Sequence, residues 1–439
     1  MTDLLTTILH ILLGLTAVLT TVYLLVTLSV LWRRRHPDAP KVAVGGPYPS
    51  VTIQIPTYNE LAAIQCALRC LKFDYPADRY EILIGDDSNK PEVSARIDRF
   101  VAEHPRVRVI RRGGNAGYKP GNLNHMLIHS KGDYLLVFDS DFLPEADFLK
   151  KIVAPVMRDP ELAGVQARWR VLNPLQSSAS IMGASIVYVI HTVILPFLWR
   201  FCGTSVFCGS AELVRRDLLE AGGKWREGSL TEDIDYTFRV YIRNQRIGFA
   251  DDVECESEVP HNFPDLFRQQ MRWAYGVTRC FVDHGAVLLT SGLATGRRKL
   301  AMMLFGSGYL MTAMLVGMLI IGFLKVLMPL LSGDAAIKPW PHQLGETVIY
   351  IFLSSGLLIT SLSSAAVSQF GWRAVLRLLV TSYTVGVVLM LYVVRGMCIA
   401  LTGKPMKWFM LKKAGNEAAP SYREGTPEGA VTAEALLDR

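Results

Sequence analysis

A long uncharged apolar run near the start of the chain limits what this sequence can fold into. Leu4 to Trp32 form 29 residues without a charged side chain, and Arg33, Arg34 and Arg35 follow directly. About 20 apolar residues are enough to cross the hydrocarbon core of a bilayer. A secretory signal peptide has a shorter apolar core, with its basic residues before that core. We therefore expect residues 1–32 to be a retained transmembrane anchor, with the N-terminus outside and the next domain in the cytoplasm.

Three further apolar runs, at 300–331, 347–370 and 374–401, predict a C-terminal membrane region. The 439 residues are 50% hydrophobic and 19% charged, which is typical of membrane segments joined to a soluble domain. Basic residues flank both ends of the last run, so its topology stays open between a single pass and an interfacial or hairpin-like segment. We expect residues 402–439 to be a cytoplasmic tail.

The net charge of +7 is modest, and its most compact basic cluster lies beside the first apolar run. That placement favours a cytoplasmic membrane flank over a nucleic-acid-binding patch. We therefore expect membrane lipids, and no nucleic acid, among the partners of this chain.

The middle of the chain, residues 49–298, predicts a separate soluble domain of the α/β class. Four β-rich runs begin at Val51, Tyr80, Val107 and Tyr134, and helical patterns alternate with them. Such alternation predicts a largely parallel sheet, whose ligands bind beyond the carboxyl ends of the strands. The residues that follow each strand are therefore the first candidates for a site.

Short polar side chains follow the first two predicted strands. Thr57, Tyr58 and Glu60 follow the first strand, and Asp86 and Asp87 follow the second. Such side chains can hydrogen-bond a base and a ribose, and Tyr58 offers an aromatic face. The same residue types also form ordinary turns, so both interpretations stay open here.

Two carboxylates separated by one residue follow the fourth predicted strand. Asp139 and Asp141 can hold one divalent cation and leave coordination positions for phosphate oxygens, although Asp pairs are also common in turns. Upstream, Lys119 lies in the string KPGNLN, whose glycine would let a loop approach a phosphate. The alternative is that Lys119 is a loop lysine exposed to solvent.

A second acidic pair, Glu232 and Asp233, opens a later stretch of helical period. Carboxylates at a helix start often serve as capping groups. One of them can instead be a general base, which requires only hydrogen-bond reach of an acceptor hydroxyl.

Two Arg-Trp pairs complete the candidate residues. Trp169 follows an arginine in QARW, and Arg272 and Trp273 follow Gln269 in QQMRW. An aromatic ring beside a planar cation can stack on a sugar or contact a diphosphate. A tryptophan near a membrane segment is also a common interface anchor.

Taken in order, the strings PTYNE, DD, KPGNLN, DSD, FCGS, TED and QQMRW closely resemble the membrane-bound family 2 glycosyltransferases of the cellulose synthase and cellulose-synthase-like type. The resemblance runs from about residue 50 to 275, with apolar segments on both sides. It implies a GT-A glycosyltransferase domain with a mixed, mainly parallel sheet, flanked by transmembrane α-helices.

The resemblance also implies a role for each matching residue. The residues that it places on the nucleotide are Thr57, Tyr58, Glu60, Asp86, Asp87 and Lys119. It places Asp139 and Asp141 on the diphosphate and its Mg²⁺ or Mn²⁺, and it makes Asp233 the catalytic base. The residues that it places around the acceptor sugar and the diphosphate are Cys208, Glu232, Gln269, Arg272, Trp273 and Trp169.

The implied reaction is inverting, metal-dependent transfer of a sugar from a nucleotide-diphosphate sugar to a growing β-linked polysaccharide at the cell membrane. UDP-glucose is favoured as donor and GDP-mannose is possible; export or accessory subunits are possible partners. The alternative is transfer of one sugar to a lipid, as in ceramide glucosyltransferases. One departure from the family is Phe409 to Lys413, which lacks the threonine of a gating segment.

Overall fold

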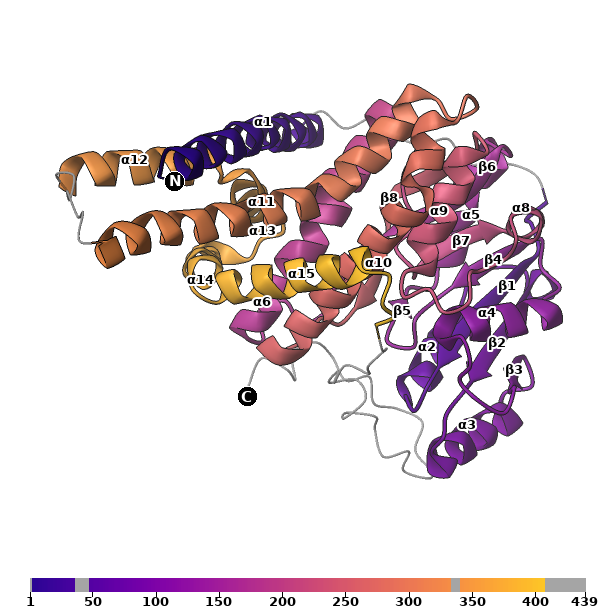
Figure 1. Cartoon of the computed structure of the whole chain (residues 1–439). Helices are drawn as coiled ribbons and strands as arrows, with labels where there is room; N and C mark the ends of the chain where they lie inside the picture. Colours follow the sequence, from indigo (N-terminus) through magenta and orange to yellow (C-terminus); the bar gives the residue numbers. More distant parts are fainter. Residues whose placement is uncertain (1, 36–46, 333–339, 407–439) are drawn as a thin grey trace.

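The computed structural model describes residues 2–35, 47–332 and 340–406 (Figure 1). Most of the predicted tail and the segment at Phe409 lie outside these residues. Eight strands form one sheet in the order β3-β2-β1-β4-β7-β6-β8-β5. The strands are β1 Val51–Thr57, β2 Tyr80–Asp86, β3 Val107–Ile110, β4 Tyr134–Val137, β5 Leu143–Pro144, β6 Leu162–Val171, β7 Glu212–Arg215 and β8 Arg246–Ser257.

The sheet is mixed and mainly parallel, as the sequence predicts. β3, β2, β1 and β4 run parallel to one another, and β6 runs parallel to β8. β7 is antiparallel to both β4 and β6. All seven residues of β1 are buried, and its polar side chains Thr52 and Gln54 have hydrogen-bond partners in Glu81 and Ser130.

Helices cover both faces of the sheet. One core lies under α2 (Ala62–Cys70), α3 (Pro91–Glu103) and α5 (Phe148–Arg158). The core of the opposite face includes residues of α4 (Tyr118–His129) and α9 (Glu232–Ile242). A short helix, α8 (Arg216–Ala221), and a 3₁₀ turn at Ala77–Arg79 complete this part of the chain.

An apolar helical segment, Ser178–Cys202, lies inside the α/β domain, where the sequence analysis expects no membrane-type helix. It consists of α6 (Ser178–Tyr188), a π-helical turn (Val189–Ile194), α7 (Leu195–Phe197) and a second π-helical turn (Leu198–Cys202). It is long and apolar enough to cross a bilayer, but 78% of its most apolar stretch is buried within the protein. Its apolar character therefore reflects packing between the sheet and the other apolar helices.

Seven long helices make up the rest of the described chain: α1 Thr2–Arg35, α10 Phe263–Thr290, α11 Gly296–Ser332, α12 Trp340–Leu353, α13 Gly356–Val367, α14 Gly371–Tyr383 and α15 Val385–Leu401. Figure 1 shows α1 and α11 to α15 grouped on one side of the molecule and the sheet on the other. Tyr23 of α1 bonds to Ser307 of α11, and Thr27 of α1 bonds to Thr360 of α13. Buried hydroxyl pairs of this kind link helices in an apolar environment.

Within the described residues, three helices are long and apolar enough to cross a membrane, or four if a bent pair counts as one span. Two of the predicted apolar runs differ from single helices. The run at 347–370 is divided between α12 and α13, and the last run is divided between α14 and α15 with a bend of 57°. Such a bend suits a broken span or a re-entrant segment, so the topology of this run remains a prediction.

α15 packs directly against α10 because of one glycine. A Cβ placed on Gly396 would lie 2.4 Å from the carbonyl oxygen of Met271, so a larger residue would force the two helices apart. The hydroxyl of Tyr275 donates to the carbonyl of Lys404, 3.1 Å away, just beyond α15. This packing fixes the part of α10 that carries Gln269, Arg272 and Trp273.

Candidate active site

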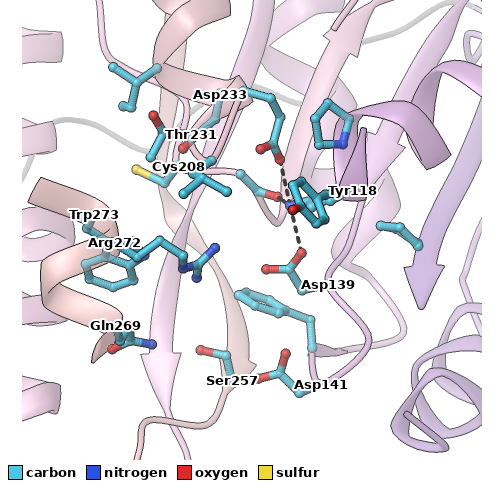
Figure 2. Close-up of a pocket in the computed structure, with 18 of the residues that line it drawn as sticks. Tyr118, Asp139, Asp141, Cys208, Thr231, Asp233, Ser257, Gln269, Arg272 and Trp273 are labelled. Atoms are coloured by element: carbon cyan, nitrogen blue, oxygen red, sulfur yellow. Dashed lines mark hydrogen bonds and ion pairs between the residues drawn. The ribbon is translucent and has the colours of Figure 1, made fainter. Parts of the chain in front are cut away.

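A cavity lies at the carboxyl edge of the sheet. β1 pairs with β2 so that Thr57 is opposite Asp86, and β1 pairs with β4 so that Gln54 is opposite Val137. The residues that follow these strands therefore meet at one edge, where a cavity of about 230 Å³ opens. Figure 2 shows Gln269, Arg272 and Trp273 on one wall of it, with Asp139 and Asp141 opposite.

The cavity brings together nearly every residue that the sequence analysis singles out. The predicted residues that line it are Thr57, Tyr58, Glu60, Asp87, Lys119, Asp139, Asp141, Trp169, Cys208, Glu232, Asp233, Gln269, Arg272 and Trp273. Phe207 and Ser210 are buried behind the wall that Cys208 forms.

Asp86 is placed differently from the other predicted site residues, because it does not line the cavity. Its carboxylate accepts hydrogen bonds from the hydroxyl of Ser94 at 2.7 Å and from Arg111 Nε at 2.8 Å. Burial would raise the pKa of Asp86, but its hydrogen bonds with Ser88, Ser94 and Arg111 outweigh burial and lower the pKa. Asp87, its neighbour, does line the cavity and pairs with Arg112 at 2.6 Å.

Lys119 lies in the first turn of α4 and not in a loop, which corrects the sequence interpretation. Pro120 is tolerated there because the first N–H groups of a helix need no helical partner. The Lys119 ammonium pairs with Asp139 at 2.7 Å and with Glu232 at 3.1 Å. Burial alone would lower the pKa of Lys119, but the two carboxylates outweigh it and raise the pKa. The lysine therefore remains a cation beside the acids.

Asp233 is a buried acid in the first turn of α9, as the helical pattern predicts. Its side chain is only 8% exposed, yet it lines the cavity. Burial and the neighbouring carboxylate of Glu232 raise the pKa of Asp233 to about 7, while Lys119 acts in the opposite direction. A carboxylate with a pKa near the working pH is suited to general-base chemistry.

Glu212, on β7, is a buried acid that the sequence analysis misses. Its carboxylate accepts the backbone N–H of Gly209 at 2.9 Å. Burial and the nearby charge of Asp233 raise the pKa of Glu212 well above its usual range. Gly209 has a φ of +86°, and a Cβ there would lie 3.4 Å from Asp233 Oδ2. Glu212 thus supports a glycine turn that must pass close to Asp233.

Asp139 and Asp141 are the candidate metal ligands. The described residues contain no group of three or more His, Cys, Asp or Glu side chains arranged to hold a metal. Two carboxylates in a cavity nevertheless suit Mg²⁺ or Mn²⁺, because these ions prefer oxygen ligands and keep positions for water and phosphate. The donor set therefore fits a cation that a diphosphate would share.

α10 supplies a cationic and aromatic wall. The Arg272 side chain extends toward Asp139 (Figure 2). Its Nε is buried without a hydrogen-bond partner among the described residues. Burial lowers the pKa of Arg272, although Asp139, Glu232 and Asp233 oppose that effect. A buried guanidinium N–H without a partner is the kind of donor that a bound phosphate oxygen can satisfy.

The cavity continues from the acids into an apolar part that the sequence analysis does not predict. Its lining there comes from helices α6, α10 and α11 and from the π-helical turn, and consists of Val187, Ile190, His191, Val277, Phe305 and Tyr309. All of these residues except Val277 lie within apolar runs, where membrane contact and a cavity wall give the same pattern. His191 stands out in the sequence, because it is a histidine inside so apolar a segment.

The sheet, its two helical faces and the acids at its carboxyl edge define the chain as a protein with a GT-A-like glycosyltransferase fold. Residues 49–276 match the family described as "Glycosyltransferase like family 2", and the chain belongs to this family. The match covers the region of the predicted soluble domain from its first strand into α10.

Several known proteins are similar to this chain. A probable glucomannan 4-beta-mannosyltransferase of Arabidopsis thaliana is 32% identical over 240 residues, which are 52% of this chain and 44% of that protein. A beta-monoglucosyldiacylglycerol synthase of Synechocystis is 29% identical over 258 residues, 56% of this chain and 52% of that protein. The chain thus spans about half the length of the curated relatives it matches.

A solved structure extends the comparison to the fold of nearly the whole chain. A mannosyltransferase from Pyrobaculum calidifontis, solved in complex with GDP-Man and Mn²⁺, covers 89% of this chain and 99% of its own, with a TM-score of 0.54. At 18% sequence identity, this similarity concerns the fold alone.

Proposed function

We propose that this protein is an inverting, divalent-metal-dependent hexosyltransferase that extends a β-linked polysaccharide at the cell membrane, with its catalytic domain in the cytoplasm. The observation that carries the proposal is one continuous cavity. It joins Lys119, Asp139 and Asp233 at the sheet edge to Trp273 and to an apolar part between helices. A charged donor and an extended acceptor can therefore meet at Asp233.

In this proposal the acid and the cations have different roles. Asp233 accepts the proton of the attacking acceptor hydroxyl, while Arg272 and Lys119 stabilise negative charge on the leaving diphosphate. Asp139 and Asp141 would hold Mg²⁺ or Mn²⁺, which supplies further stabilisation of that charge when bound. Direct attack with a single base inverts the anomeric carbon, so an α-linked donor gives a β-linkage.

The donor remains to be chosen between UDP-glucose and GDP-mannose. UDP-glucose is the default donor although the motifs do not specify it, and several relatives are named glucomannan 4-beta-mannosyltransferases. Those names make GDP-mannose an equal candidate for this chain, and both belong in the first assay.

A lipid acceptor is the second candidate, because the part of the cavity beyond Asp233 is lined by Val187, Ile190, Val277 and Phe305. Apolar walls of this kind suit an acyl chain as well as the faces of sugar rings. One relative is named a beta-monoglucosyldiacylglycerol synthase, which supports the same alternative.

The experiment that tests the proposed activity uses membranes that contain the full chain. Labelled UDP-glucose, GDP-mannose, UDP-galactose and UDP-N-acetylglucosamine are each supplied with Mn²⁺ or Mg²⁺. We expect transfer from UDP-glucose or GDP-mannose that EDTA abolishes. Absence of transfer from every donor, or full transfer in EDTA, would contradict the proposal.

We expect Asp141→Asn to weaken nucleotide binding through the metal. An amide is a poorer metal ligand than a carboxylate, so the affinity for UDP or GDP should fall and should depend less on Mn²⁺. Calorimetry of the purified protein with and without Mn²⁺ measures both effects. Asp147→Asn, at an exposed ion pair with Lys151, serves as the control. Equal metal dependence in Asp141→Asn and the parent would remove Asp141 from the metal site.

We expect kcat/KM to fall as the pH drops through about 7, because Asp233 must be deprotonated to act as a base and its pKa is raised to about 7. At pH 6 about a tenth of the molecules would carry the active form. Glu232→Gln removes a negative charge that raises this pKa, so the acidic limb should move to lower pH. A pH-rate profile of both proteins is the measurement. An acidic limb that stays in place or moves upward in Glu232→Gln would contradict this assignment.

A further inference from the structure

Trp169 lies at an irregular point of the sheet. The pairing of β6 with β8 advances by one residue from Gln166 to Ala167, but it jumps from Ala250 to Glu254 between Ala167 and Arg168. A bulge of this kind alters the direction of the side chains that follow it. The strand geometry alone therefore does not hold the indole of Trp169 in the cavity wall.

His191 contacts Trp169 in two ways. The backbone N–H of Trp169 donates to His191 Nδ1 at 3.3 Å. The two rings also stack, with centroids 4.8 Å apart and planes inclined by 21°. Because Nδ1 accepts this hydrogen bond, the imidazole is neutral, with its proton on Nε2. His191 is 1% exposed and lines the same cavity.

The indole is also held from other directions. Phe142 packs edge-on against it at a centroid distance of 5.1 Å. Its Nε1 donates to the carbonyl of Ser210 at 3.0 Å. The hydroxyl of the same Ser210 accepts the backbone N–H of Asp139 at 2.9 Å. Ser210 therefore holds the indole through its carbonyl and, separately, the backbone of Asp139 through its hydroxyl.

The backbone around His191 is unusual as well. His191 lies in the π-helical turn Val189–Ile194, within an otherwise apolar helical segment. π-helical turns are rare and occur frequently at functional sites. An apolar side chain could fill the same volume as the His191 ring. A buried histidine in such a turn is therefore explained if the position of its ring is required for function.

We propose that His191 is a positioning residue that orients Trp169 as the wall on which the acceptor sugar stacks. This inference rests on the proposed function, because it assigns the acceptor side of the same cavity to a carbohydrate. His191 acts through Trp169 and takes no part in proton transfer. Its removal therefore affects acceptor use and leaves the binding of the nucleotide unchanged.

A double-mutant cycle tests whether His191 acts through Trp169. The assay measures transfer to a β-1,4-linked hexasaccharide of glucose or mannose. We expect His191→Leu to lower kcat/KM for this acceptor by about tenfold or more, since small displacements of a positioning group have effects of this order. In the Trp169→Ala background the same change should have an effect of less than about twofold. Equal effects in both backgrounds would overturn the proposal.

Two matched variants separate positioning from general loss of structure. His191→Asn offers an oxygen at about the place of Nδ1 and should recover part of the lost kcat/KM. His129→Leu makes the same type of change at the exposed end of α4, away from the cavity, and should have no effect. Affinity for UDP or GDP should be unchanged in all three variants. Loss of nucleotide affinity in His191→Leu would contradict a role confined to the acceptor.

A spectroscopic measurement keeps the inference testable even if the proposed reaction is wrong. The protein is labelled with 5-fluorotryptophan, and its ¹⁹F resonances are recorded in detergent, with Trp169→Phe assigning the signal of Trp169. We expect His191→Leu to shift or broaden that signal alone and to abolish its response to the hexasaccharide. An unshifted signal would overturn the positioning role, whereas absence of sugar transfer by the parent would overturn only the proposed function.

Discussion

Asp233→Asn should nearly abolish sugar transfer and retain nucleotide binding. The amide keeps the size of the side chain but cannot accept the proton of the acceptor hydroxyl. A positioned general base contributes about 10²–10⁴-fold to a rate, so the loss of kcat should lie in that range. Transfer assays with labelled donor, together with calorimetry of UDP or GDP binding, measure the two properties separately.

Asp235→Asn provides the matched control for this prediction. Asp235 lies two residues further along α9, is 1% exposed, and bonds to His284 at 2.7 Å and to Arg239 at 2.8 Å. It does not line the cavity. We expect this change to lower the thermal midpoint and to leave turnover per folded molecule nearly unchanged. Near-parent turnover of correctly inserted Asp233→Asn would exclude Asp233 as the base.

Trp273→Ala should insert normally, bind nucleotide and make little or no polymer. A ring that stacks on the acceptor sets the distance from the acceptor hydroxyl to the donor carbon, and a displacement of about 1 Å can reduce the rate by on the order of 10²-fold. Residual turnover should appear as free sugar released from the donor, because water can replace a misplaced acceptor. Separation of polymer from free sugar after incubation with labelled donor measures this change.

The competing interpretation of Trp273 is an anchor at the membrane interface, and Trp372 offers a comparison. Trp372 is the second residue of α14 and is 71% exposed, whereas Trp273 lines the cavity. An anchor requires only an amphipathic ring at headgroup depth. Trp372→Ala should therefore leave the polymer yield unchanged. Long product from a correctly inserted Trp273→Ala protein would exclude the acceptor role.

Much of the α/β domain could be predicted because its strands are buried and apolar. Tyr80 and Tyr134 begin β2 and β4 as the sequence predicts, since buried parallel strands give short apolar runs bounded by turn residues. The residues at the ends of these strands could be found for the same reason. The topology then places them at a single edge without any further information.

The apolar part of the site could not be predicted, because a single sequence does not distinguish lipid contact from burial inside the protein. Val187 and Ile190 read as part of an apolar helix, and only the packing of Ser178–Cys202 between sheet and helices makes them cavity walls. Glu212 has no motif of its own, and its role depends on the turn at Gly209. The run at 347–370 divides into α12 and α13 where Gly356 contacts Thr20 of α1, a contact that the sequence does not reveal.

The central claim is tested most directly by the size and the anomeric configuration of the product. Membranes with the unmutated chain are incubated with α-linked, ¹³C-labelled UDP-glucose or GDP-mannose and Mn²⁺, and the product is sized by gel filtration and analysed by NMR. We predict a long polymer with β-anomeric signals, absent from Asp233→Asn membranes. An α-linked product would contradict inversion. A product made of one sugar on a lipid would show that the acceptor is a lipid and not a growing polysaccharide.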